Sequence, residues 1–166
     1  MKLEQISSWN SYEAIEHELT NAEIKSWLLE QGPITKRIKS MKEFRLELIQ
    51  DELSDVNEDE ILFLNIHTKE IRVREVILYG NENPMVFART IIPSTTIEKG
   101  LKELGTLGNK PLGDILFEKD IFSKNDIVFA TFYDGKSLFW GRKIKYTVKD
   151  QPFSVMEVFL IKSFDE

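Results

Sequence analysis

The chain has 166 residues, of which 42% are hydrophobic and 30% are charged, the composition of an ordinary globular protein. Its length suits a single domain covering residues 1–166. The absence of cysteine excludes disulfides, thiolate metal sites and cysteine nucleophiles. A net charge of -6 argues against nucleic acid or an anionic membrane surface as a partner, because both attract basic faces. No segment resembles a signal peptide or a membrane span, so we expect a cytoplasmic protein.

Two segments carry the signals of amphipathic helices. In "TNAEIKSWLLEQGP", Thr20 and Glu23 have the spacing of a capping box, and the Gly-Pro pair predicts the end of the helix. In "STTIEKGLKELG", Thr95 and Glu98 repeat that spacing before a final glycine. We therefore predict one helix in each segment.

The rest of the chain reads mainly as strands. The first begins at Phe44, and the others cover residues 61–66, 71–79, 85–92, 127–133, 138–148 and 153–161. The short polar turns "GNENP", "YDGK" and "KDQP" favour antiparallel pairing, because parallel crossovers are much longer. We predict an α+β fold with an antiparallel sheet of about six strands covered by helices. The acidic stretch "DELSDVNEDE" is expected to be a solvated loop.

The last predicted strand, "FSVMEVFLI", is the most apolar stretch and contains one charged residue, Glu157. Alternation places Glu157 on the same face as Val155 and Phe159, and the opposite face is apolar too. A buried carboxylate must become neutral, pair with a cation or accept hydrogen bonds. The pattern suits an acid–base group, and equally an exposed position or a structural ion pair.

Two arginines interrupt the hairpin "VREVILYGNENPMVFARTIIP". Arg74 shares a face with Val76, and Arg89 shares one with Phe87, so the pattern directs both toward apolar surroundings. A guanidinium group keeps its charge there and matches a carboxylate in bidentate contact. An arginine and Glu157 from one sheet predict either a structural salt bridge or two ends of a pocket for a small organic anion.

Two further segments have features of a ligand site. In "LGNKPLGDILF", Pro111 and Gly113 flank Leu112 and predict a tight turn that presents backbone N–H groups before a short helix, although an ordinary turn has the same composition. In "FWGRKIKYTV", Gly141 permits a close backbone approach beside Arg142. The alternative is a tryptophan packed on a neighbouring strand, with Arg142 solvated.

Other common catalytic signatures are missing from the sequence. His17 and His67 are isolated and lack acidic partners at ligand spacing, so we predict no metal site. Ser94 lacks a nucleophile elbow and is better explained by helix capping. No glycine-rich segment has the phosphate-loop pattern.

Six segments, in order, resemble the chorismate pyruvate-lyase family. They are "WLLEQGPITKR", "VREVIL", "ARTIIP", "LGNKPLGDILF", "WGRK" and "EVFL", and they extend over residues 27–160. The resemblance implies an antiparallel sheet with helical flaps that enclose a buried site. It also implies a cofactor-free reaction in which chorismate loses its enolpyruvyl side chain as pyruvate and becomes 4-hydroxybenzoate. We expect a monomer whose partners are this substrate and product.

The resemblance assigns roles to four residues. Arg74 would hold the ring carboxylate, Glu157 would lie near the ring hydroxyl, and the backbone contacts of the family fall on Ile34 and Leu112. We add the hypotheses that Glu157 assists proton transfer and that Arg142 helps to hold the carboxylate of the side chain.

The chain departs from the family pattern at three positions. Ile34 replaces a methionine, and Lys143 with Ile144 replaces an arginine followed by a small polar residue. Arg89 has no assigned role: it would either orient Glu157 or another acid, or form a structural ion pair.

A binding module is the competing function. The same fold serves as the effector-sensing domain of some bacterial transcription regulators, so a copy could bind an aromatic acid without converting it. The segment before the first helix is too short to supply a basic winged helix, and retention of Arg74 and Glu157 favours the enzyme.

Overall fold

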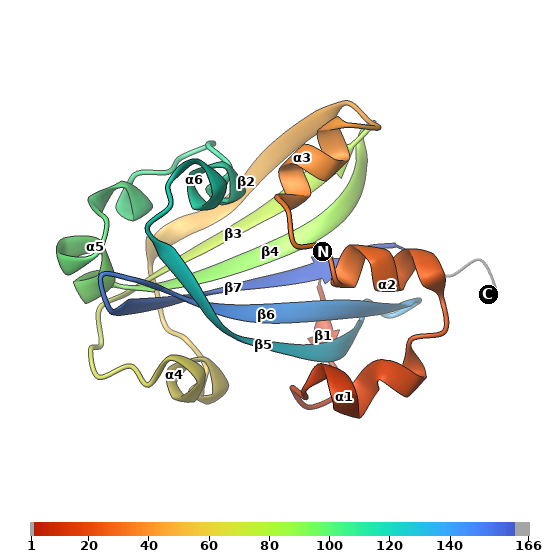
Figure 1. Ribbon diagram of the computed structural model, residues 1–166, viewed down its shortest axis with the longest axis horizontal. Coiled ribbons are helices and arrows are strands. Elements are labelled where there is room, and N and C mark those ends of the chain that lie inside the picture. Colours follow the sequence, from red (N-terminus) through yellow and green to blue (C-terminus); the bar gives the residue numbers. More distant parts are fainter. Residues whose placement is uncertain (1, 162–166) are drawn as a thin grey trace.

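Seven strands form one antiparallel sheet in the order β1-β5-β6-β7-β4-β3-β2 (Figure 1). The computed structural model describes residues 2–161. The strands are β1 (Glu4–Gln5), β2 (Phe44–Leu53), β3 (Ile71–Gly80), β4 (Asn83–Pro93), β5 (Phe122–Tyr133), β6 (Leu138–Val148) and β7 (Gln151–Phe159). The α-helices are α1 (Tyr12–Ile15), α2 (Ala22–Leu28), α3 (Ile34–Lys39), α4 (Glu58–Leu64), α5 (Ser94–Lys99) and α6 (Leu112–Glu118), and the 3-10 helices are η1 (Glu16–Glu18) and η2 (Lys102–Gly105). The α+β fold class is confirmed.

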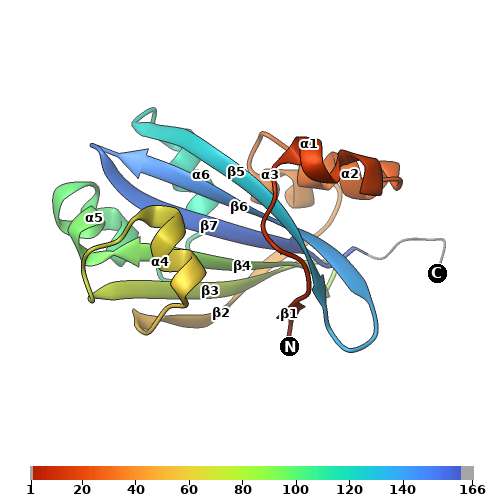
Figure 2. The same ribbon diagram turned by 90° about the horizontal axis from the view of Figure 1, so that it is seen from below.

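Both faces of the sheet are covered. We call the face that carries Arg74 the inner face; α2 and α3 pack on it through Trp27 and Ile38, which are almost fully buried. On the outer face, Leu64 of α4 packs against Val73. Figure 2 shows α4 on the opposite side of the sheet from α3 and α6. Burial on two faces explains why the central strands read as apolar runs rather than as alternating patterns.

The turns of two hairpins lie within the segments "GNENP" and "KDQP", where the sequence predicts them. Asn81 and Glu82 join β3 to β4, and Lys149 and Asp150 join β6 to β7, all with positive φ angles between 50° and 64°. Two consecutive residues with positive φ match the right-handed twist of the flanking strands. These turns fix the register of both hairpins.

The strand predicted at residues 61–66 is wrong, because residues 61–64 form the end of helix α4 and Asn65 caps it. Asn57 and Glu60 form a capping box at its start: the Asn57 side chain accepts from the Glu60 backbone, and the Glu60 carboxylate accepts from the Asn57 backbone. A short apolar run looks the same in a buried strand and in a buried helix. The cap in the preceding acidic stretch was the signal that distinguishes them.

Neither predicted capping box forms. Asn21, not Thr20, caps α2 by accepting hydrogen bonds at 3.0 and 3.1 Å. Helix α5 begins after Pro93 with no side-chain cap, and the predicted single helix divides at Gly100 into α5 and η2. A Cβ atom at Gly100 would lie 2.5 Å from the Thr96 carbonyl oxygen, so the chain turns there through a space that only glycine fits.

Arg89 forms a structural ion pair on the outer face. Its Nε and Nη2 donate to the two carboxylate oxygens of Glu60 at 2.7 and 3.0 Å, and its Nη1 donates to Glu75 at 3.0 Å. Glu60 is only 6% exposed, so the prediction that its whole acidic stretch is solvated is wrong. The bidentate contact holds α4 on β4.

Replacing Glu60 with Gln should destabilise the fold, because the Arg89 charge would lose its main partner while the cap acceptor remains. We expect the free energy of unfolding, measured by urea titration, to fall by about 2 to 3 kcal/mol. The matched control is Glu58→Gln on the exposed side of the same helix, with a change within about 0.5 kcal/mol. Equal effects of the two substitutions would contradict the anchoring role.

Gly141 on β6 allows the Phe132 ring of β5 to lie against the backbone. A Cβ atom there would lie 2.6 Å from the ring edge of Phe132, which is buried. We therefore expect Gly141→Ala to lower stability by about 1 to 3 kcal/mol in urea unfolding. Adding Phe132→Leu should recover part of that loss, and an unchanged single variant would show that the ring is free to shift.

Candidate active site

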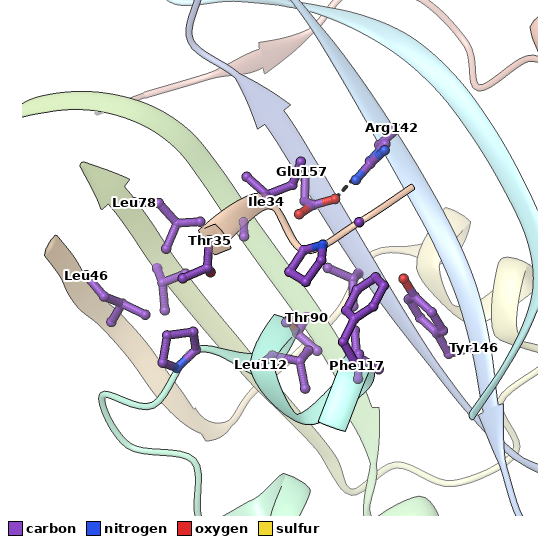
Figure 3. Close-up of a pocket in the computed structure, with 18 of the residues that line it drawn as sticks. Ile34, Thr35, Leu46, Leu78, Thr90, Leu112, Phe117, Arg142, Tyr146 and Glu157 are labelled. Atoms are coloured by element: carbon purple, nitrogen blue, oxygen red, sulfur yellow. Dashed lines mark hydrogen bonds and ion pairs between the residues drawn. The ribbon is translucent and has the colours of Figure 1, made fainter. Parts of the chain in front are cut away.

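A pocket lies on the inner face of the sheet, between the starts of α3 and α6 (Figure 3). All five residues to which the sequence assigns site roles line it: Ile34, Arg74, Leu112, Arg142 and Glu157. Much of its wall is apolar, with side chains that include Leu46, Val76, Leu78, Ala88, Leu116 and Phe117. A pocket of this kind suits a small organic molecule with a few polar groups.

Arg74 reaches the pocket from the middle of β3 and is 3% exposed. Its Nη2 donates to the carbonyl oxygens of Gly108 and Lys110 at 3.1 and 2.8 Å. These two residues lie in the loop that leads to α6, so Arg74 fixes that loop over the sheet. Its Nε is buried and has no hydrogen-bond partner among residues 2–161. Burial lowers the pKa of this guanidinium and the Asp51 charge raises it, but an arginine stays protonated.

Arg142 and Glu157 face each other across β6 and β7, where they are register partners. Arg142 Nε donates to Glu157 Oε1 at 2.9 Å, the contact drawn in Figure 3. Arg142 Nη1 donates to the carbonyl oxygens of Leu28 and Glu30 at 3.1 and 2.7 Å, at the end of α2 and in the chain that leads to α3. Arg142 is 4% exposed, so the solvated alternative for this residue is wrong. The last strand indeed places its carboxylate beside a cation.

Ile34 and Leu112 are the first residues of α3 and α6, and each follows a proline, Pro33 or Pro111. Proline is favoured there because its fixed φ suits the start of a helix and it has no N–H group to satisfy. The backbone N–H groups of a first helical turn have no partner within the helix. Two short helices therefore begin at the pocket wall, from segments about 80 residues apart in the chain.

Sequence reasoning missed several polar residues of the pocket, among them the two ionisable side chains Lys124 and Tyr146. Tyr146 lies on the same strand face as Arg142, four residues further on, so alternation along "GRKIKYT" would have identified it. Burial and the Glu157 charge raise the pKa of the Tyr146 phenol, which keeps the group protonated. Lys124 precedes a register shift in β5, and strand alternation in the sequence does not predict this shift.

The departure from the family pattern at Lys143 lies outside the pocket. Lys143 points to the outer face, where its ammonium group lies 4.5 Å from the ring centres of both Trp9 and Phe63. Burial lowers the pKa of this amine, while Glu60 and Asp59 raise it. Its neighbour Ile144 lies in the hydrophobic core. Neither residue lines the pocket, so the departure leaves the charge of the pocket unchanged.

Residues 2–161 contain neither a candidate metal centre nor a membrane-spanning helix. Among them, no group of three histidine or acidic side chains is placed to hold a metal ion. None of the helices is long and apolar enough to cross a bilayer.

Comparison with known proteins identifies the family. The family model for chorismate lyase matches residues 3–166. A "Probable chorismate pyruvate-lyase" of Pseudoalteromonas atlantica is 32% identical over 162 residues, covering 87% of this chain and 83% of the relative. One of the same name from Methylococcus capsulatus is 30% identical over 152 residues, covering 82% and 94%.

A solved structure shares the fold at low identity. A transcriptional regulator of the GntR family from Enterococcus faecalis superposes with a TM-score of 0.54 at 9% identity, over 74% of this chain and 94% of the other. This likeness concerns the fold alone. The family match extends over nearly the whole chain, and the chain therefore belongs to the chorismate lyase family.

Proposed function

We propose that the protein is a chorismate pyruvate-lyase, a carbon–oxygen lyase that converts chorismate to 4-hydroxybenzoate and pyruvate. The observation that carries the proposal is the single pocket in which two arginines, one glutamate and the starts of two helices meet. Membership of the chorismate lyase family and the names of the relatives support the same reaction. The monomeric state and the cytoplasmic location stay predictions of the sequence.

The reaction is an elimination that needs no cofactor. A proton leaves the ring carbon that bears the hydroxyl group, and the electron pair of that C–H bond completes the aromatic ring. The bond from the neighbouring ring carbon to the ether oxygen breaks, and the side chain leaves as enolpyruvate, which takes up a proton and becomes pyruvate. Because aromatisation supplies much of the driving force, the protein has to orient a dianion, exclude water and move one proton.

Arg74 is the proposed ligand of the ring carboxylate. Its buried Nε has no partner, although a buried N–H group without a hydrogen bond is unfavourable. A carboxylate bound beside it would satisfy this donor with a charge-assisted hydrogen bond. The carbonyl groups of Gly108 and Lys110 accept from Nη2 of the same guanidinium, so the plane of the group is oriented before a ligand arrives.

Glu157 is the proposed acid–base group. Arg142 holds its Oε1 at 2.9 Å, while Oε2 has no hydrogen bond to the described residues and can receive the ring proton. Three of the five N–H groups of Arg142 are directed at Glu157 and the two carbonyl groups, which leaves Nη2 for the side-chain carboxylate of the substrate. The backbone at Ile34 and Leu112 would complete the contacts, and the apolar walls would exclude water.

The direct experiment is to incubate the purified protein with chorismate and to measure pyruvate and 4-hydroxybenzoate. We expect both products in equal amounts, without added metal or cofactor. Binding of 4-hydroxybenzoate without formation of either product would instead indicate a sensor of aromatic acids.

Replacing Glu157 with Gln should remove the acid–base group and keep its shape. We expect kcat to fall by about 100-fold or more, as for loss of a general base. The inhibition constant of 4-hydroxybenzoate should change by less than about threefold, because the ring carboxylate still meets Arg74.

The matched control for this substitution is Glu118→Gln, an exposed glutamate at the end of α6. This control should leave kcat and the inhibition constant of 4-hydroxybenzoate unchanged. Full turnover by the Glu157 variant would remove this carboxylate from the mechanism.

A further inference from the structure

The charge of the pocket differs from that of the whole chain. Its lining contains three cationic side chains, Arg74, Lys124 and Arg142, and one anionic side chain, Glu157, which gives a net charge of +2. The chain as a whole has a net charge of -6. A cleft of one sign attracts ligands of the opposite sign and concentrates them. The pocket is therefore suited to a ligand with two negative charges.

The two arginine side chains of the pocket are already hydrogen-bonded to the protein. Arg74 donates to two carbonyl oxygens of the loop before α6, and Arg142 donates to Glu157 and to two carbonyl oxygens at the start of the α2–α3 connection. Lys124 differs, because its side-chain ammonium group has no hydrogen bond or ion pair to residues 2–161. It lies where the pocket opens to solvent, and its whole charge is available to a ligand.

A local irregularity directs Lys124 into the pocket. Strand β5 shifts register between Lys124 and Asp126, so Asn125 is an extra residue with no partner on β6. Bulges of this kind redirect a side chain and often lie beside functional sites. Lys124 is paired with Tyr146 and shares its face of the sheet, whereas Asp126 is paired with Lys145 on the opposite face.

Lys124 shares the pocket with the ion pair. It is paired with Tyr146 on β6, the strand that also carries Arg142, and Lys124, Arg142 and Glu157 all line the pocket. Burial lowers the pKa of Lys124, as does the positive charge of Arg142 to a smaller extent, and the Glu157 charge raises it. These three side chains together carry one excess positive charge.

We propose that Lys124 binds the second carboxylate of the substrate, the one on the enolpyruvyl side chain, together with Nη2 of Arg142. This inference rests on the proposed function and adds to it a residue that distinguishes substrate from product. Chorismate carries two carboxylates, whereas 4-hydroxybenzoate carries only the ring carboxylate. Lys124 would favour the dianion and would lose its ligand when pyruvate leaves.

The test compares two stable aromatic probes that need no turnover. 3-(Carboxymethoxy)benzoate carries two carboxylates in the arrangement of chorismate, and 3-methoxybenzoate lacks the second one. Dissociation constants for both probes would be measured by isothermal titration calorimetry on the wild-type protein and on Lys124→Gln. Lys136→Gln is the matched control, because it removes the same charge from an exposed hairpin loop away from the pocket.

We expect Lys124→Gln to weaken binding of the dianionic probe by about 10-fold, the effect of losing one partly exposed charge-assisted hydrogen bond, and to change the monoanionic probe by less than about twofold. Lys124→Arg should retain the preference, and Lys136→Gln should leave both constants unchanged. With chorismate itself, the Lys124→Gln substitution should raise KM by a similar factor.

Equal effects on both probes, or no effect on either, would overturn the assignment of Lys124. These outcomes are independent of the proposed reaction. If the wild-type protein forms no pyruvate, the proposed function fails, and the two probes still decide whether Lys124 binds a second carboxylate.

Discussion

The ion pair between Arg142 and Glu157 is the interaction on which the site and the chain between α2 and α3 depend. Both side chains lie on the inner face of a sheet whose central strands are buried on two sides, and a charge there is tolerated only with a partner and with hydrogen bonds. Arg142 supplies the partner for Glu157, and the carbonyl groups of Leu28 and Glu30 satisfy two of its remaining donors. The same guanidinium group therefore neutralises the carboxylate and fixes the chain that leads to α3.

Arg74 repeats this arrangement on the other side of the pocket. It reaches out from β3 and holds the loop before α6 through the carbonyl groups of Gly108 and Lys110. Both connections that lead to the pocket helices are thus hydrogen-bonded to arginines that are themselves fixed in the sheet. The proposed ligands of the substrate and the elements that exclude water depend on the same two side chains.

The two arginines of the β3–β4 hairpin have different functions because they lie on opposite faces. Arg74 faces the pocket, and Arg89 faces α4, where Glu60 and Glu75 neutralise it. Their sequence surroundings are equally apolar, since each face of the hairpin is buried under a different helix. The pattern predicted that both would need partners, and only the positions of α4 and α6 decided which partner each one has.

The sequence by itself determined most of the antiparallel strands and their tight turns, and it showed that a carboxylate buried in β7 would need a partner. These features follow from local rules: alternation, turn residues and the cost of an isolated charge. Only the tertiary structure decided that Asn125 bulges and that Lys124 joins the pocket. Strand register and the packing of distant segments determine these features, and neither is encoded in a short stretch of sequence. The family resemblance, rather than periodicity, indicated Ile34 and Leu112, because a contact made by a backbone N–H group does not require a particular side chain.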